Sequence, residues 1–409
     1  MTLPRGRAPA PPPVDEAFWL SEPARVTPAR WSRIAQLLLV GFLVVLMALC
    51  GLLVLAVVTS DTGLVGFLIG VTLALLPLPL VLAAFRWVDR YEPEPRRLLA
   101  FAFFWGATVA ALVAAVLNTA TTMVVAAGTS NPGHGMATTA VYVAPWVEEA
   151  AKGLAVLAVF LFRRREFDGV VDGIVIAGLA GLGFAFTENI LYFGRAFLAG
   201  SQDLGLSGGI FAVGLTFVLR GVLSPFAHPL FTVMTGIGFG VAARSGSTAV
   251  RWLAPVVGYL AAVVLHTAWN YSALGGLGSF LTGYAVIMVP AFALVVAVAV
   301  WSRRREGAIV ARWLPAYAQA GWLAPEDVAM LSSLPARRLA VAWAKGMYGE
   351  RGARTLPAFQ HAATELAFLR DRAERGAVHE DFIQRERSLL ADVARTRSAI
   401  RSPDLPLTH

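Results

Sequence analysis

Long apolar runs are the feature that most constrains this chain. A helix needs about 20 apolar residues to cross a hydrocarbon core of roughly 30 Å. Only 15% of the residues are charged and 57% are hydrophobic, whereas soluble domains carry roughly 25% charged residues. The sequence therefore predicts an all-α, polytopic membrane protein of about eight transmembrane helices, at Ile34–Val58, Leu64–Phe85, Leu99–Ala127, Thr138–Phe162, Val170–Gly194, Ser224–Ala243, Trp252–Tyr271 and Ser279–Trp301. Part of the apolar sequence between Gly208 and the sixth run is expected to be re-entrant or interfacial.

Arginine placement predicts the orientation, because cytoplasmic loops are rich in Lys and Arg. Arginines cluster before the first run, in 86–97, in 163–165, at 244 and 251, and in 303–305, whereas three of the alternate connections have none. Both termini are therefore expected on the cytoplasmic side.

Three regions follow from this pattern. Residues 1–33 are rich in Pro and Arg and are expected to be a disordered cytoplasmic tail. Residues 34–301 form the predicted membrane core. Residues 302–409 are predicted to form a cytoplasmic helical domain, with amphipathic helices at Ala308–Ala320, Ala324–Leu331, Ala336–Tyr348, Leu356–Arg375 and Asp381–Arg401.

Composition excludes several other classes of protein. Cys50 is the single cysteine, so neither a disulfide scaffold nor a multi-thiolate zinc site is available. The net charge of +8 comes from arginines between apolar runs, so we expect a lipid partner and no nucleic acid. The oligomeric state stays open.

Charged side chains within the runs are the candidate functional residues, because each costs at least about 2.5–3.5 kcal/mol at bilayer depth. The fourth run contains Glu148, Glu149 and Lys152, at helical spacings that bring them together. A structural ion pair would explain Lys152 and one glutamate, but not a second adjacent carboxylate.

Three later runs add Glu188 with Asn189, His228 eight residues after Arg220, and His266 with Asn270. Each also has a purely structural interpretation. Glu188 would pair with Arg195, His228 would be a hydrogen-bonded core residue, and His266 would bond to Asn270 between helices.

Depth argues for treating these residues as one set. With a rise of about 1.5 Å per residue, Glu148 and Glu149 lie roughly 15 Å below the outer face, and Glu188, His228 and His266 lie roughly 5–10 Å below it. Four helices thus place acids and imidazoles in the same half of the membrane.

Such a set suits peptide hydrolysis in two ways. His228 and His266 could bind Zn²⁺ with Glu188, or with Glu148 or Glu149, as third ligand. A remaining glutamate of the pair would then act as general base, and Lys152, Asn189 or Asn270 would donate to the oxyanion. Alternatively, a desolvated glutamate activates water without a metal, and the His and Asn residues stabilise the intermediate.

Other acidic residues near the cytoplasmic side receive structural interpretations. Asp168 and Asp172 are expected to form a salt-bridge cluster next to Arg163–Arg165. Asp89, Glu92 and Glu94 are expected to be accessible to water.

Several ordered motifs together resemble the PrsW family of intramembrane proteases, over roughly residues 85–300. The resemblance implies a bacterial plasma-membrane metalloprotease that cleaves a membrane-bound substrate, such as an anti-sigma factor. It places the paired glutamates at Glu148 and Glu149, the third acidic position at Glu188, and the histidines at His228 and His266. The family is also similar to the group of CAAX prenyl proteases and bacteriocin-processing enzymes, for which a metal-free glutamate mechanism is a candidate. The motifs are Asp-Arg-Tyr-Glu-Pro-Glu-Pro (89–95), Glu-Glu-Ala-Ala-Lys (148–152), Asp-Gly-Ile (172–174), Gly-Phe-Ala-Phe-Thr-Glu-Asn (183–189), Arg220 with His228, and His-Thr-Ala-Trp-Asn (266–270).

Two other classes compete with a protease that acts on single-pass membrane substrates. A proton- or ion-coupled transporter could use the same buried acids and histidines as a relay, although transporters usually show internal repeats, and this sequence shows none. An inactive scaffold would have no use for so many buried polar groups.

Overall fold

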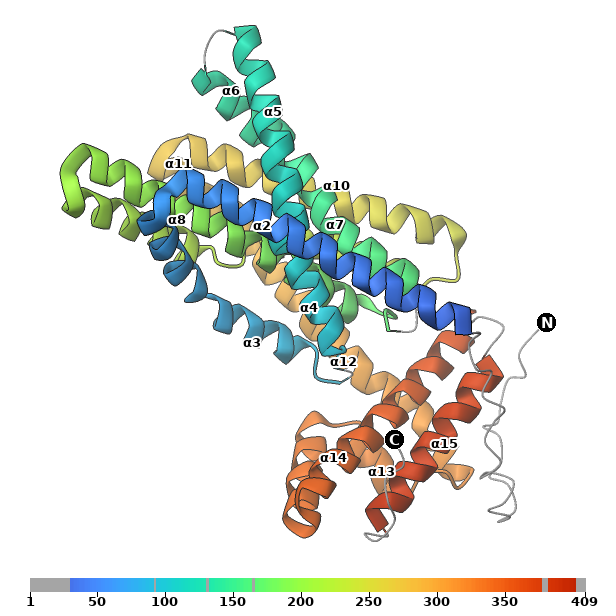
Figure 1. Ribbon diagram of the computed structural model, residues 1–409. Helices are drawn as coiled ribbons and strands as arrows, with labels where there is room; N and C mark the ends of the chain where they lie inside the picture. Colours follow the sequence, from blue (N-terminus) through green and yellow to red (C-terminus); the bar gives the residue numbers. More distant parts are fainter. Residues whose placement is uncertain (1–29, 92, 130–131, 164–165, 377–381, 402–409) are drawn as a thin grey trace.

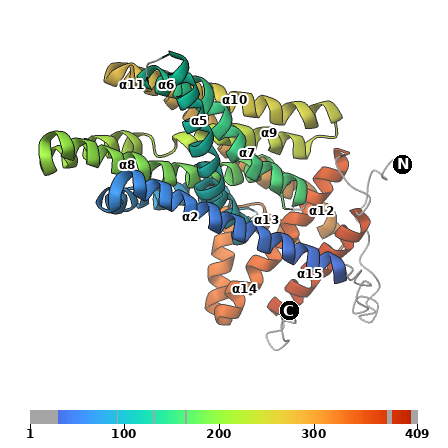
Figure 2. The same ribbon diagram turned by 45° about the horizontal axis from the view of Figure 1, so that its top comes forward.

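The computed structural model describes residues 30–91, 93–129, 132–163, 166–376 and 382–401, and within these ranges every regular element is a helix. The predicted all-α class is confirmed for this part of the chain. Figures 1 and 2 show a bundle of long helices, with α13, α14 and α15 packed together at one end. Most of the predicted disordered tail (residues 1–29) and Glu92 lie outside the described residues.

The first helices follow the predicted runs, with breaks at glycine and proline. Helix α2 covers Arg30–Leu75 and changes direction at Gly63, whose φ of 65° favours glycine. A second break at Leu76–Pro77 separates α3, Leu78–Val88. The third run is one continuous helical path made of α4 (Arg96–Phe104), the π-helical turn η1 (Trp105–Ala110) and α5 (Ala111–Thr129).

The next helices carry the charged side chains. They are α6 (Pro132–Thr138), η2 (Thr139–Val143), α7 (Ala144–Phe162), α8 (Val170–Phe217), η3 (Val218–Leu223), α9 (Ala227–Arg244) and α10 (Thr248–Leu274). Helix α8 breaks at Gly205, where φ is 69°. The chain then returns along α8, since Gly200 and Gly208 meet backbone to backbone. The apolar sequence from Gly208 is thus a helix, and it brings Arg220 back toward Glu188.

Five stretches of the described chain are long and apolar enough to cross a membrane, namely Leu37–Val88, Arg96–Gly128, Val170–Arg244, Thr248–Leu274 and Gly276–Gln319. The first and third are 52 and 75 residues long, which is far more than one crossing needs. Helix α7 fails the same criterion because its 19 residues include Glu148, Glu149 and Lys152.

Helix α8 is the centre of the bundle, and its glycines allow other helices to touch its backbone. A side chain at Gly181 would collide with the backbone of His228, and one at Gly183 would collide with the backbone of Phe103. Gly173 and Gly236 face each other in the same way. Small residues thus let the helix backbones approach closely at these positions.

The C-terminal third consists of α11 (Gly276–Gly283), η4 (Tyr284–Met288), α12 (Val289–Gln319), α13 (Pro325–Leu331), α14 (Leu334–Glu374) and α15 (Phe382–Arg401). The predicted helix Ala308–Ala320 was wrong as a separate element, because α12 continues through Arg303–Arg305. Arginine is a good helix former, so a charged segment gives no reason to end a helix. The predicted break at Gly349 is confirmed, with a φ of 62° inside α14.

The C-terminal helices contact the loops between membrane helices. Arg337 is buried and donates to the carbonyl oxygens of Leu331 (2.7 Å) and Tyr91 (3.0 Å) and to the hydroxyl of Thr364 (2.6 Å). Asp168 pairs with Arg372 at 2.6 Å. The Asp172 carboxylate accepts from the backbone of Asp168 and Gly169 at the start of α8. The predicted salt bridge is thus found for Asp168, with Arg372 as its partner, whereas Asp172 caps α8.

The loop between α3 and α4 corrects one prediction. Asp89 and Glu94 were expected to be accessible to water, but their exposed fractions are only 6% and 8%. Asp89 accepts a hydrogen bond from the Glu94 backbone at 2.9 Å. Sequence could not show this burial, because it depends on contacts of the loop with distant helices.

We predict that Arg337→Ala loosens the C-terminal helices from the rest of the protein. The change removes three hydrogen bonds and leaves two buried carbonyl oxygens without that donor, which should cost about 3 kcal/mol. Limited proteolysis in detergent should show faster cleavage after residue 320. The control is Arg338→Ala, at the exposed neighbouring position, and it should be cleaved at the wild-type rate. Equal cleavage rates for both variants would contradict the prediction.

We predict that Asp89→Asn stabilises the protein in a pH-dependent way. Burial raises the pKa of Asp89 from 3.8 to about 7. The folded state therefore holds a proton that the unfolded state releases above about pH 4, so wild-type stability falls between about pH 4 and 7. The variant should gain up to about 4 kcal/mol at pH 8 and nothing near pH 4. Thermal unfolding at both pH values measures this, with the exposed Glu326→Gln as control. A gain that does not change with pH would refute the prediction.

Candidate functional site

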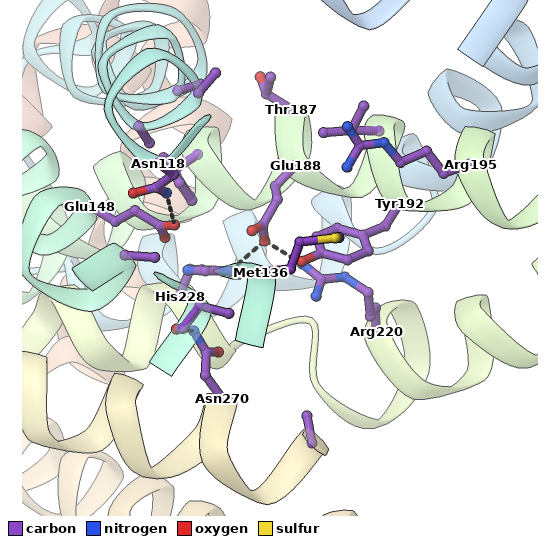
Figure 3. Close-up of a pocket in the computed structure, with 18 of the residues that line it drawn as sticks. Asn118, Met136, Glu148, Thr187, Glu188, Tyr192, Arg195, Arg220, His228 and Asn270 are labelled. Carbon is purple, nitrogen blue, oxygen red and sulfur yellow. Dashed lines mark hydrogen bonds and ion pairs between the residues drawn. The ribbon is translucent and has the colours of Figure 1, made fainter. Parts of the chain in front are cut away.

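A cavity of about 750 Å³ lies between α2, α5, α7, α8, α9 and α10, and Figure 3 shows the polar part of its wall. Most of its lining is apolar, with small side chains from α5 and η2. Glu148, Glu188 and His228 come from three different helices and lie on this wall. The structure thus brings together residues that are up to 80 positions apart in the sequence.

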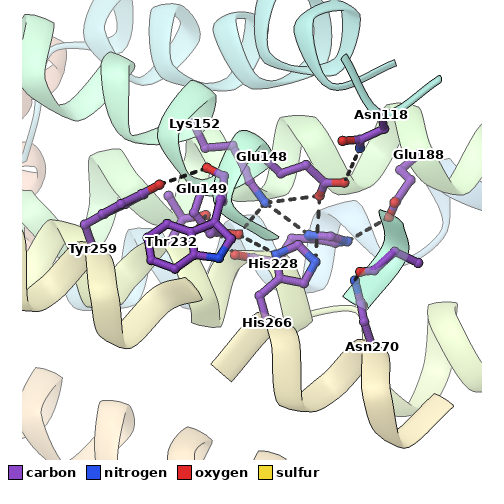
Figure 4. A network of polar contacts seen from close by, with 12 residues as sticks. Asn118, Glu148, Glu149, Lys152, Glu188, His228, Thr232, Tyr259, His266 and Asn270 are labelled. Atoms are coloured by element: carbon purple, nitrogen blue, oxygen red, sulfur yellow. Dashed lines mark hydrogen bonds and ion pairs between the residues drawn. The ribbon is translucent and has the colours of Figure 1, made fainter. Parts of the chain in front are cut away.

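Behind the wall, Lys152 and Glu149 form a fully buried ion pair (Figure 4). Their closest atoms are 2.6 Å apart, and both side chains have 0% exposure. The second oxygen of Glu149 accepts from the Thr232 hydroxyl at 2.9 Å. A buried ion pair is stable only when its remaining hydrogen-bonding capacity is satisfied, and these contacts satisfy Glu149.

His266 is held in one orientation by the same carboxylate. Its Nδ1 lies 2.9 Å from Glu149 Oε1, and its ring stacks on Phe231 with centroids 4.7 Å apart. With Nδ1 as the donor, Nε2 carries a lone pair; this tautomer is assigned from the contacts. Nε2 points toward Glu148 Oε2, at 3.7 Å.

His228 lies between Lys152 and Glu188. Its Nδ1 is 3.2 Å from Lys152 Nζ, and its Nε2 is 2.7 Å from Glu188 Oε2. Because the ammonium group can only donate, Nδ1 is the acceptor and Nε2–H donates to Glu188. Arg220 pairs with the same carboxylate and donates to Asn189 Oδ1 at 2.8 Å.

Glu148 is the least satisfied acid of the site. Its Oε1 accepts from Asn118 at 3.1 Å, whereas Oε2 is buried and accepts no hydrogen bond from the described residues. Lys152 reaches Oε2 only at 3.9 Å. Glu149 pairs with Lys152 and Glu188 with Arg220, so Glu148 has no closely paired cation. Two lone-pair atoms, Glu148 Oε2 and His266 Nε2, therefore face each other with no protein donor between them.

This gap suits either a water molecule or a metal ion. Two ligand atoms of a tetrahedral zinc ion lie roughly 3.4 Å apart, close to the 3.7 Å between these two atoms. Among the described residues, the group compact enough to hold an ion is Glu148, His228 and His266, with ligand atoms within 4.8 Å of one another. Of the residues predicted as third ligand, Glu148 is part of this group, whereas Glu188 lies outside it and pairs with Arg220. The alternative structural interpretation, a pair between Glu188 and Arg195, is not found, because Arg195 pairs with Asp61.

The three predicted oxyanion donors all contact other parts of the protein, but Asn189 does so through its amide oxygen and not through its N–H groups. Lys152 is bound to Glu149 and sits 4.2 Å from the centre of the Phe184 ring. Asn270 donates to the Ala140 backbone oxygen at 2.8 Å, although it lines the cavity. Asn189 accepts from Arg220. All three hold the helices and the acids in place.

Sequence reasoning missed two residues that contact the acids. Asn118 is a polar residue inside the third apolar run, a signal that could have marked it. Thr232 gave no such signal, because threonines commonly bond to their own helix backbone, as this one also does to His228.

Comparison with known proteins finds relatives for the part of the chain that carries this site. Residues 94–295 match the family described as PrsW family intramembrane metalloprotease. The resemblance of this region to the PrsW family is confirmed. The matched range includes α4 to α11 and therefore every residue of the site described above.

Two proteins named Protease PrsW are similar to this PrsW-like region. The protein of Geobacillus kaustophilus (strain HTA426) is 30% identical over 162 residues, which are 40% of this chain and 61% of the relative. The protein of Clostridioides difficile (strain 630) is 30% identical over 164 residues, which are 40% of this chain and 62% of the relative. The chain thus spans about three fifths of the length of these relatives. No solved structure matches it.

Proposed function

We propose that this protein is an intramembrane protease that hydrolyses peptide bonds of membrane-associated proteins at the cavity wall formed by Glu148, Glu188 and His228. The observation that supports the proposal best is the pair of facing acceptors, Glu148 Oε2 and His266 Nε2, 3.7 Å apart. A water molecule that donates to both would be oriented and polarised for attack on a carbonyl. The resemblance to the PrsW family points to the same chemistry.

In this proposal Glu148 transfers protons, and the surrounding residues hold the reacting groups in position. Glu148 takes a proton from the attacking water and returns it to the leaving nitrogen. Asn118 orients Glu148 through its other oxygen. Glu149 and Lys152 do not touch the cavity wall; they hold His266 and His228 at the required angles. The paired glutamates therefore have different roles, with Glu148 reactive and Glu149 positioning.

We further propose that Glu148, His228 and His266 hold a zinc ion when one is present. A bound zinc ion would polarise the substrate carbonyl and lower the pKa of water. The donor set fits, because Glu148 Oε2 and His266 Nε2 already offer free lone pairs, and Glu149 supports His266 from behind, as carboxylates commonly do for metal-bound histidines. His228 would have to exchange its contact with Lys152 or Glu188.

We predict that Glu148→Gln lowers cleavage by about 10²–10⁴-fold, the usual contribution of a general acid–base group. The assay uses purified protein in liposomes with a single-pass membrane reporter. Asp203→Asn makes the same chemical change at an exposed position outside the cavity lining, and should cleave at the wild-type rate. Full activity of Glu148→Gln would rule out this assignment.

Elemental analysis of the same preparations tests the zinc proposal. Near-stoichiometric zinc that is lost together with activity in His228→Ala and His266→Ala would support it. Cleavage at an undiminished rate by protein free of metal would reject the zinc proposal and leave the glutamate mechanism. Active transport without any cleavage would instead favour the transporter alternative.

We infer eight crossings from the helix breaks. The stretch Leu37–Val88 divides at Gly63, and Val170–Arg244 divides near Leu204–Gly205. These two divisions turn the five apolar stretches into seven crossings, and α7 is the eighth. The proposed organisation is a cytoplasmic tail (1–33), a membrane core (34–301) in the bacterial plasma membrane and a cytoplasmic helical domain (302–409). The proposed substrates are single-pass membrane proteins such as anti-sigma factors.

Cysteine labelling in intact cells tests this orientation. In a Cys50→Ala background, we expect Asp203→Cys, in the outer turn of α8, to react with a membrane-impermeant maleimide. Ser247→Cys, between α9 and α10, should react only after the cells are opened. The reverse pattern would invert the proposed topology.

A further inference from the structure

The first half of α14 carries an apolar stripe that no described part of the protein covers. Leu339, Trp343 and Met347 are spaced four residues apart, so they lie on one face of the helix. Their exposed fractions are 72%, 58% and 61%. Beyond Trp301, the described residues expose only one other large apolar side chain, Ile383. We call these three residues the α14 stripe.

Basic side chains flank the α14 stripe. Arg338 and Lys345 are exposed on the same helical segment, and Arg354 is exposed shortly after it. The only acid nearby is Glu350, which is paired with Lys345 at 2.9 Å. An apolar face beside basic residues is the pattern of helices that lie in the interface of an anionic membrane.

The position of the segment brings the stripe close to the bilayer. Arg337, next to the stripe, donates to the Tyr91 carbonyl oxygen. Tyr91 comes only three residues after Val88, the last residue of α3 and of the first membrane-spanning stretch. From Arg337 to Met347 the helix extends only about 15 Å. Figure 1 shows the α14 label below α3, on the side of the C-terminal helices away from α15.

Two tryptophans mark the membrane edge at the same level. Trp87 near the end of α3 and Trp301 in α12 are both exposed, with Arg303 over the Trp87 ring at 4.2 Å. Tryptophan and arginine are enriched where a helix leaves the hydrocarbon. Arg303 and Arg338 are close enough to interact electrostatically, so the stripe begins beside this belt.

We propose that the segment Leu334–Tyr348 of α14 lies on the membrane surface, with the α14 stripe inserted among the headgroups of anionic phospholipids. A second protein is a poorer fit, because a stable protein interface needs roughly 20–30 residues on each side. Three large side chains suffice for a helix already tethered at the bilayer. The contact would hold the C-terminal helices against the membrane face below α3.

Fluorescence quenching by lipids tests this placement in the full-length protein. In the Cys50→Ala background, Leu339→Cys and Met347→Cys are labelled with bimane and reconstituted into vesicles of phosphatidylcholine and phosphatidylglycerol. Some of the lipid carries a nitroxide near the headgroup. We expect about twofold stronger quenching at 339 and 347 than at the control positions, because only the stripe is immersed.

Two controls keep the test specific. Lys345→Cys lies on the same helix but off the stripe, and Ser388→Cys is exposed on α15. Quenching at 339 and 347 no stronger than at 345 would overturn the proposal. So would a bimane signal shielded from both lipid and water, since that result would mean a protein partner covers the stripe.

The anionic part of the proposal has its own comparison. The change Arg338→Gln with Arg354→Gln should weaken quenching at 347 in vesicles that contain phosphatidylglycerol, but not in pure phosphatidylcholine. If the protein that keeps both arginines shows identical quenching at 347 in the two lipids, anionic headgroups have no role. No cleavage is measured, so the outcome is independent of the proposed protease activity.

Discussion

The close approach of helices to the glycine-lined surface of α8 is the constraint on which the rest of this structure depends. Gly181 and Gly183 let the backbones of α9 and α4 touch α8 directly. In a membrane, where lipid competes equally for apolar side chains, such backbone contact is a main source of helix association. The contact at Gly181 involves the backbone of His228 itself, so the packing of α8 on α9 directly sets where one imidazole of the candidate site lies.

In the packed bundle, two of the three glutamates of the site form ion pairs. Lys152 neutralises Glu149 and Arg220 neutralises Glu188, while Glu148 keeps one oxygen without a hydrogen bond. Leaving a carboxylate unpaired at this depth is costly. The arrangement is therefore best explained if the site normally takes up a water molecule, a metal ion or a substrate group.

The C-terminal helices lie outside the PrsW-like region but are not loosely attached to it. Arg337 binds the loop between α3 and α4, and Asp371 pairs with Arg244 at the end of α9. These contacts connect the C-terminal helices to the loop that contains the buried Asp89 and to α9, the helix that also carries His228.

The sequence alone determined the class, the order of the helices and the set of buried polar residues. Apolar runs of membrane length can form little other than helices, because backbone groups must bond within the segment. It also pointed to Glu148, Glu149, Glu188, His228 and His266, because charge in such runs is rare. The continuation of α12 past Arg305 and the burial of Asp89 could not be read from it, since both depend on local stability or distant contacts.

Only the tertiary structure decided which buried charges pair with each other. Sequence spacing treats Glu148 and Glu149 alike, yet one faces the cavity and the other faces Lys152 and Thr232. It also could not show that Glu188 pairs with Arg220, because Arg220 returns to it only through the turn at Gly205. The physical reason is that partner choice among buried charges is set by distances of a few ångströms between helices, and helical periodicity within one segment carries no information about them.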